Sequence, residues 1–212
     1  IIIRIKPDLI INCIGLVSLE LCESKKDLAK YLNNDLVGHL VKAASSTKSK
    51  FIHISTDHYY TGKTKILHAE EEPVEIVNNY ALSKYEGENK ALTYKKSIVI
   101  RTNITGYRHD PKKPTFIEWL LKAIVSREKL TLLTDFYTST IDCDSFCRLA
   151  WKSVLSDYNG LINIAAGNAL SKSEFAHLIA KQLSINLDWV SYGLVNETII
   201  PRRANNLGLD CR

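Results

Sequence analysis

Methionine is absent from this sequence, which begins with three isoleucines in place of an initiator residue. We therefore expect a fragment of a longer chain. No apolar run approaches the roughly 18 residues that a membrane-spanning helix requires, and no signal peptide is visible. Although the net charge is +5, no long basic tract interleaved with aromatic residues occurs. We expect neither membrane insertion nor nucleic-acid binding.

Cysteine is sparse and irregularly placed. The five cysteines have no spacing typical of a disulfide framework, and no partners at the spacing of metal ligands. This pattern predicts reduced thiols, no metal site and a cytoplasmic location. The densest positive segment is residues 108–113, RHDPKK. It is either a solvated loop or a point that attracts a diphosphate-bearing ligand.

The remaining composition is that of an ordinary soluble globular protein. The chain has 212 residues, of which 45% are hydrophobic and 24% are charged. A chain of this length buries a sizeable core and fits one large domain or two small ones.

Short apolar segments alternate with helix-like segments in the first half of the chain. They predict strands at residues 7–13, 51–54 and 97–101, and helices at 25–45 and 81–94. This alternation is typical of an α/β fold with a doubly wound parallel sheet. Ligands bind such sheets at the carboxyl ends of the strands, where Gly15, Thr56, Asp57 and Asn103 are expected.

The second half of the chain has a different pattern. Helices are predicted at residues 115–127, 144–155 and 171–183, and strands at 130–134 and 161–164. A capping box, Ser171 to Glu174, opens the last of these helices. We therefore expect residues 1–106 to form most of a nucleotide-binding domain and residues 107–212 to form mainly a smaller α+β substrate lobe.

The most informative pair in the sequence is Tyr80 and Lys84. Residues at i and i+4 share one face of a helix, and Asn78 and Asn79 are suitable caps for its start. Such a phenol and ammonium, together with the hydroxyl of Thr56, can pass a proton to a carbonyl oxygen. A pair of this spacing also arises by chance in a chain with many tyrosines and lysines.

A second tyrosine–lysine pair of this spacing, Tyr59 and Lys63, spans the turn signal Thr61–Gly62. Because side chains across a turn need not share a face, we interpret that segment as a solvated loop.

The motifs, taken in order, resemble those of the extended short-chain dehydrogenase/reductases, and most closely the dTDP-4-dehydrorhamnose reductase group. The resemblance covers nearly the whole chain. The matching segments are PDLIIN (7–12), CES (22–24), LN (32–33), HISTDHYYTG (53–62), NYALSK (79–84), GE (87–88), RTN (101–103) and PRRANNLGLD (201–210).

This resemblance implies a role for each matching residue. Tyr80 is implied to be the proton donor, and Lys84 its partner and the anchor of the cofactor ribose. Thr56 is implied to orient the sugar. The same resemblance assigns cofactor contacts to Gly15, Leu16, Val17, Tyr80 and Lys84, and substrate contacts to Thr56, Asp57, Asn103 and Ile104.

Three departures from the group stand out. Ile104 occupies the position where rhamnose-forming members carry a tryptophan, and the loop at residues 135–140 is only loosely similar to its counterpart. The sugar is therefore left open. The opening Gly-x-x-Gly-x-x-Gly unit is absent, so two βα units of about 50 residues are expected before Ile1. The cofactor is NAD or NADP, and the sequence does not choose between them.

The function implied is an NAD(P)H-dependent reductase of a nucleotide-linked 4-keto-6-deoxy sugar, in the biosynthesis of a surface polysaccharide. A homodimer is expected. We also expect Lys84 to lower the pKa of Tyr80 toward neutrality. The alternatives are a nucleotide-sugar epimerase or dehydratase, and a non-catalytic subunit that binds the cofactor.

Overall fold

A parallel four-stranded sheet forms the centre of the computed structural model, which describes residues 1–195 and 201–212. Its strand order is β1-β2-β4-β9, and every neighbouring pair is parallel. The strands are β1 (Leu9–Asn12), β2 (Lys50–Ile54), β4 (Ser97–Arg101) and β9 (Gly160–Asn163). All four run in the same direction, so their carboxyl ends, and the polar residues that follow them, meet at one edge.

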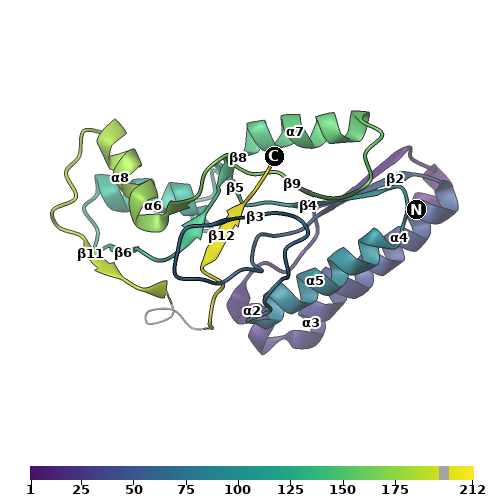
Figure 1. The fold of residues 1–212 in the computed structure, drawn as a ribbon, viewed down its shortest axis with the longest axis horizontal. Coiled ribbons are helices and arrows are strands. Elements are labelled where there is room, and N and C mark those ends of the chain that lie inside the picture. The colour runs from purple at the N-terminus through teal and green to yellow at the C-terminus, as the bar shows by residue number, and fades with distance from the viewer. Residues whose placement is uncertain (196–200) are drawn as a thin grey trace.

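Helices cover both faces of this sheet (Figure 1). On one face lie α4 (Leu36–Thr47) and α5 (Asn79–Leu92), whose residues Val37 and Ala91 pack against Phe51 and Val99. On the other face lies α7 (Cys143–Leu155), whose Phe146 packs in a second apolar cluster. Ile52, Ile98 and Ile100, which alternate along the strands with Phe51 and Val99, belong to this cluster. Continuous apolar strands are the expected consequence of burial on both sides. The predicted doubly wound α/β fold is confirmed.

The helix expected at residues 25–45 is present with an irregularity. It consists of α3 (Lys26–Lys30), a π-helical turn (Tyr31–Asp35) and α4, which follow one another without a break. Two short helices were not predicted, α1 (Ile2–Ile5) and α2 (Leu19–Ser24). The second begins where the Ser18 hydroxyl accepts a hydrogen bond from the amide of Leu21, which is a normal N-cap.

The π-helical turn lies directly against α5 at Gly87. A Cβ atom placed on Gly87 would lie 1.9 Å from the carbonyl oxygen of Asn33, so no side chain fits between the two backbones. Glycine allows this close approach because it has no Cβ. The contact fixes the distance between α5, which carries Tyr80 and Lys84, and the segment that follows β1.

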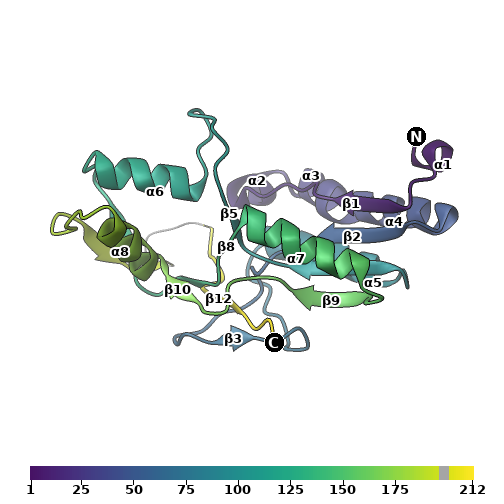
Figure 2. The same cartoon turned by 90° about the horizontal axis from the view of Figure 1, so that it is seen from above.

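A second region lies beside the sheet and is built around α6 (Phe116–Val125) and α8 (Lys172–Gln182), as Figures 1 and 2 show. Both helices open with a capping box, at Thr115 and at Ser171, and the second box was predicted. The strands of this region and of the connection to the sheet are β3 (Leu67–His68), β5 (Ile104–Thr105), β6 (Thr131–Leu133), β7 (Tyr137–Thr138), β8 (Ile141–Asp142), β10 (Leu170–Ser171), β11 (Ser191–Gly193) and β12 (Asn206–Leu209).

Small sheets join these strands. One has the order β10-β7-β12-β3, and the others pair β11 with β6 and β5 with β8. Because β12 lies next to β3, the end of the chain returns to the first half.

Two expectations need correction. The strand at residues 161–164 was placed in the smaller lobe, but β9 pairs with β4 at the edge of the main sheet, and α7 covers that sheet. The chain therefore returns to the region of the main sheet after residue 142. The division into two domains at residue 106 stays a prediction. The solvated loop predicted at Tyr59–Lys63 is wrong for Tyr59, which is fully buried with its hydroxyl 3.1 Å from Ser55 Oγ.

All five cysteines are free thiols, as predicted. Among residues 1–195 and 201–212, no helix combines the length and the apolar character that spanning a membrane would take.

The contact at Gly87 leads to a stability prediction. Gly87→Ala forces a methyl group into the Asn33 carbonyl, so we expect the free energy of unfolding to fall by about 3 kcal/mol, near the upper end for overpacking. Denaturant unfolding followed by circular dichroism measures the change. Gly167→Ala is the matched control, because nothing lies within 4 Å of its added Cβ and its effect should be small. Equal stabilities for the two variants would contradict the close approach.

Candidate functional site

Tyr80 lies near the start of α5, which Asn78 caps by accepting a hydrogen bond from the amide of Ala81 at 2.8 Å. The Tyr80 side chain is buried, and Thr56 lies close enough for its hydroxyl to act on the pKa of the phenol. The imidazole of His58 meets the Tyr80 ring edge-on, with centroids 5.5 Å apart. The phenol and the threonine hydroxyl therefore come together at the carboxyl edge of the sheet.

Lys84 follows one turn later and is also buried. Its ammonium donates a hydrogen bond to the carbonyl oxygen of Ile54, at the end of β2, over 2.7 Å. A Cβ placed on Gly15 would lie 4.0 Å from Lys84 Nζ. The loop after β1, the end of β2 and the start of α5 thus converge on one ammonium group.

The predicted acidification of Tyr80 is wrong in this structure. Burial is the largest effect and raises the pKa of the phenol, and the negative charge of Asp57 raises it further. Burial also lowers the pKa of Lys84, to about 8. Burial therefore keeps Tyr80 a protonated phenol at neutral pH, while the Lys84 ammonium donates to a strand carbonyl.

Asn33 holds the loop that follows β1. Its side-chain oxygen accepts from the amide of Leu16 at 2.7 Å, and its side-chain nitrogen donates to the Leu16 carbonyl at 3.0 Å and to the Ser83 hydroxyl at 2.9 Å. The side chain is fully buried. Asn33 therefore ties the Gly15–Leu16 loop to the helix that carries Tyr80.

A buried ion pair secures α5 to the sheet. Arg101, the last residue of β4, contacts the carboxylate of Glu88 at 2.5 Å, and both side chains are almost completely enclosed. Ser55 donates to the same carboxylate at 2.8 Å, and Arg101 donates to the Tyr60 hydroxyl at 2.7 Å. These partners satisfy both charges, which a buried pair requires. The segment Ser55–Asp57 is thereby fixed beside the helix.

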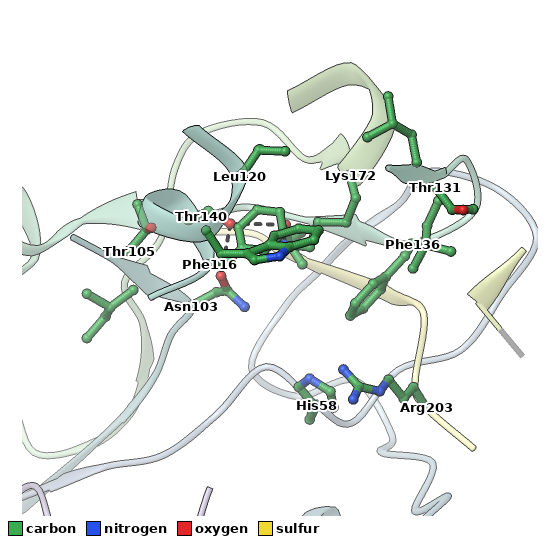
Figure 3. Close-up of a pocket in the computed structure, with 15 residues that line it drawn as sticks. His58, Asn103, Thr105, Phe116, Leu120, Thr131, Phe136, Thr140, Lys172 and Arg203 are labelled. Carbon is green, nitrogen blue, oxygen red and sulfur yellow. Dashed lines mark hydrogen bonds between the residues drawn. The ribbon is translucent and has the colours of Figure 1, made fainter. Parts of the chain in front are cut away.

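A cavity of about 640 Å³ lies between the two regions of the protein, and His58, whose ring meets that of Tyr80, forms part of its wall. Aromatic and aliphatic side chains form much of its wall, and Lys172 and Arg203 contribute positive charge, as Figure 3 shows. The lining residues are His58, Asn103, Ile104, Thr105, Phe116, Trp119, Leu120, Thr131, Leu132, Leu133, Phe136, Thr138, Thr140, Lys172 and Arg203.

Hydrogen bonds connect the cavity wall to Asp57 at the carboxyl edge of the sheet. Asn103 donates to the Asp57 carboxylate at 2.7 Å and accepts from the Thr140 hydroxyl at 2.9 Å. The Thr140 hydroxyl lies 3.0 Å from that of Thr138. Burial raises the pKa of Asp57 to about 7, while Asn103 and the positive charge of Lys172 act in the opposite direction.

The structure brings most of the predicted residues together. Thr56, Asp57, Tyr80 and Lys84 lie at one edge of the sheet, with Gly15 and Leu16 beside the lysine. The predicted substrate contacts Asn103 and Ile104 line the cavity. Val17 is 70% exposed.

The basic segment 108–113 lies elsewhere. Arg108, Lys112 and Lys113 are exposed, and none of them lines the cavity. The solvated-loop alternative describes the segment best.

Several side chains at the site escaped sequence reasoning. His58, Phe136 and Lys172 line the cavity, yet only the location of Lys172 at the start of a helix was indicated, through the Ser171–Glu174 capping box. Asn33 was part of a matching motif, which was the available signal for its role as a clamp.

The chain is similar in sequence to proteins of polysaccharide and dTDP-sugar biosynthesis. It is 28% identical over 180 residues to the spore coat polysaccharide biosynthesis protein SpsK of Bacillus subtilis, covering 84% of this chain and 62% of that protein. It is 25% identical over 215 residues to the dTDP-4-dehydrorhamnose reductase of Salmonella typhimurium, covering 97% of this chain and 71% of the enzyme. The chain thus spans about two thirds of the length of these relatives.

Solved structures share the fold. A hypothetical dTDP-4-dehydrorhamnose reductase from Sulfolobus tokodaii superposes with a TM-score of 0.87 at 27% identity, over 99% of this chain and 73% of that one. Other neighbours of the same fold were solved with NADP or NAD bound. The sequence also matches the RmlD substrate binding domain over residues 1–204. The resemblance inferred from the motifs is confirmed, and the chain belongs to the RmlD substrate-binding-domain family.

Proposed function

We propose that this protein is an NAD(P)H-dependent reductase of a nucleotide-linked 4-keto-6-deoxy sugar, acting in the biosynthesis of a surface polysaccharide. The observation that carries the proposal is the buried phenol of Tyr80 near Thr56, separated by the ring of His58 from a cavity large enough for a ligand. Membership of the family and the name of the Salmonella typhimurium relative support the same reaction.

The residues near Lys84 fit the ribose end of NAD or NADP. An ammonium has three donors, and the one described acceptor for Lys84 is the Ile54 carbonyl, so hydroxyl groups of a ribose can take the others. Gly15 has no side chain to crowd this ammonium. A Cβ there would lie 3.1 Å from Asn33 Oδ1 and 4.0 Å from Lys84 Nζ. Gly15, Leu16, Val17, Tyr80 and Lys84 would hold the cofactor, which when bound supplies a hydride to the keto carbon.

Tyr80 supplies the proton in this proposal. Its raised pKa keeps the phenol protonated, which is the state needed to donate to the oxygen of a ketone as that oxygen gains negative charge. Thr56, whose hydroxyl lies near the phenol, orients the same oxygen. Asp57, Asn103 and Ile104 would contact the sugar from the cavity side.

His58 argues against a dehydratase. That reaction needs an acid and a base beside Thr56, and Asp57 is followed here by His58. Burial and the charges of Arg203 and Lys172 lower the pKa of His58 to about 3, so this imidazole is neutral and a poor acid at neutral pH. The proposal also includes a cytoplasmic location and a homodimer.

The direct test is consumption of reduced nicotinamide. Full-length protein is incubated with NADH or NADPH and a panel of nucleotide-linked 4-keto sugars, and nicotinamide absorbance is followed. We expect one mole of cofactor to be oxidised for each mole of sugar reduced. An epimerase or dehydratase regenerates its cofactor, so conversion of the sugar without net oxidation would overturn the proposal. No conversion of any substrate would favour a non-catalytic subunit.

Removal of the Tyr80 hydroxyl should abolish turnover. We expect Tyr80→Phe to lower kcat by about 100-fold or more, the usual contribution of a positioned general acid, while cofactor affinity and the folded structure are retained. Tyr85→Phe is the control, since Tyr85 lies on the same helix and contacts the Tyr59 ring. Full activity of Tyr80→Phe would remove the phenol from the chemistry.

The buried charge of Lys84 should lower the free energy of unfolding at neutral pH while it supports cofactor binding. Because burial lowers its pKa from 10.5 to about 8, the charged form is disfavoured in the folded state. Lys84→Met should therefore weaken cofactor binding yet raise the free energy of unfolding at pH 7.

This gain should shrink as the pH rises from about 8 through 10.5, above which the lysine becomes neutral in both states. Denaturant titrations at several pH values measure it, with the exposed Lys95→Met as control. A gain that does not change with pH, or unchanged cofactor affinity, would contradict this assignment.

A further inference from the structure

Lys172 is a cation that the chemistry proposed above does not use. It is the first residue of α8, and its side chain lines the cavity between Phe116 and Phe136 (Figure 3). The ammonium lies 4.4 Å from the centre of the Phe116 ring and 5.4 Å from that of Phe136. Both rings face the charge, so they stabilise a cation at this point without neutralising it.

The hydrogen-bonding capacity of Lys172 is mostly unused within residues 1–195 and 201–212. Its one described hydrogen bond goes to the Thr138 hydroxyl at 3.2 Å, and no carboxylate forms an ion pair with it there. An ammonium has three donors. Two N–H groups are therefore available to a ligand in the cavity.

The charges that face Lys172 come from several elements. The Asp57 carboxyl lies after β2, and Arg203 lies just before β12 and also lines the cavity. On its own helix, Glu174 is engaged by the Ser171 cap and by Lys65. His58 is neutral. The cavity wall therefore carries two cations, and the Asp57 carboxyl, which has a raised pKa, lies behind Asn103 and does not line it, which favours an anionic ligand.

We propose that Lys172 binds the diphosphate of the sugar nucleotide, and that its protonation controls the affinity of the cavity for that group. The inference rests on the proposed function for the identity of the anion. A diphosphate offers several charged acceptors to the two free N–H groups, and the aromatic wall at Phe116 and Trp119 can hold the attached base.

A pH dependence follows from this geometry. Burial, together with Arg203, lowers the pKa of Lys172 to about 8 in the free protein. A bound diphosphate favours the charged ammonium and so raises that pKa. Affinity is therefore full below pH 8 and is lost as the pH rises above it. Above pH 7.5 both the diphosphate and most of Asp57 are already ionised, so their titration adds little.

The experiment is isothermal titration calorimetry of the full-length protein with dTDP and with UDP at pH 7.5 and 9.5. For the wild type we expect Kd to rise by about 20-fold between these values, since each pH unit above the pKa costs nearly tenfold. Lys172→Met should bind at least about 10-fold more weakly at pH 7.5 and show little further loss. Lys172→Arg stays charged, so it should bind tightly at both pH values.

Two controls distinguish loss of the Lys172 charge from a general loss of folding or binding. Lys181→Met alters an exposed lysine of the same helix and should behave as the wild type. Thymidine, which lacks phosphates, should show no dependence on Lys172, and it measures separately any loss of affinity caused by ionisation of the base N3–H at high pH. A wild-type pH dependence in Lys172→Met or Lys172→Arg would overturn the proposal, and so would the absence of binding by both nucleotides.

This test is independent of turnover. A protein that binds dTDP or UDP with the predicted pH dependence but oxidises no cofactor with any sugar would refute the reductase and leave the role of Lys172 standing. Turnover of a sugar, together with a nucleotide affinity that does not change in Lys172→Met, would refute the role of Lys172 and leave the reductase standing. Thermal unfolding of each variant verifies the fold, and Lys172→Arg keeps the comparison valid if Lys172→Met is unstable.

Discussion

The approach of α5 to the π-helical turn at Gly87 is the constraint on which the site depends. Because no side chain separates the two backbones, Asn33 can reach both the loop at Leu16 and Ser83 on α5. One residue further along, Glu88 pairs with Arg101 and fixes the same helix to β4. Tyr80 is thus held next to Thr56 by backbone contact on one side and by buried charge on the other.

Much of this arrangement could be predicted from the sequence. Apolar runs of strand length and helical periodicity indicated all four strands of the main sheet and the main helices, because burial on both faces leaves a strong pattern. The residues at the strand ends followed from the same topology, since parallel strands bring their carboxyl ends to one edge. Thr56, Tyr80 and Lys84 were therefore found by local spacing combined with a general rule of the fold.

The remainder depends on contacts between distant segments. The return of β9 to the main sheet could not be read from a short apolar run, which fits either region. The position of Lys172 in the cavity depends on how α8 packs on Phe116 and Phe136, 56 and 36 residues away along the chain. The sign of the pKa shift of Tyr80 was mispredicted because spacing gives the distance between two groups and not the desolvation of either.

The distribution of tryptophan has a practical consequence. The chain has three tryptophans, and Trp119 is the one that lines the cavity. Trp189 packs against the apolar core between α6 and α8, and Trp151 is exposed on α7. Occupation of the cavity by an aromatic base would quench one indole of known position, so intrinsic fluorescence offers a built-in reporter of ligand entry that needs no added label.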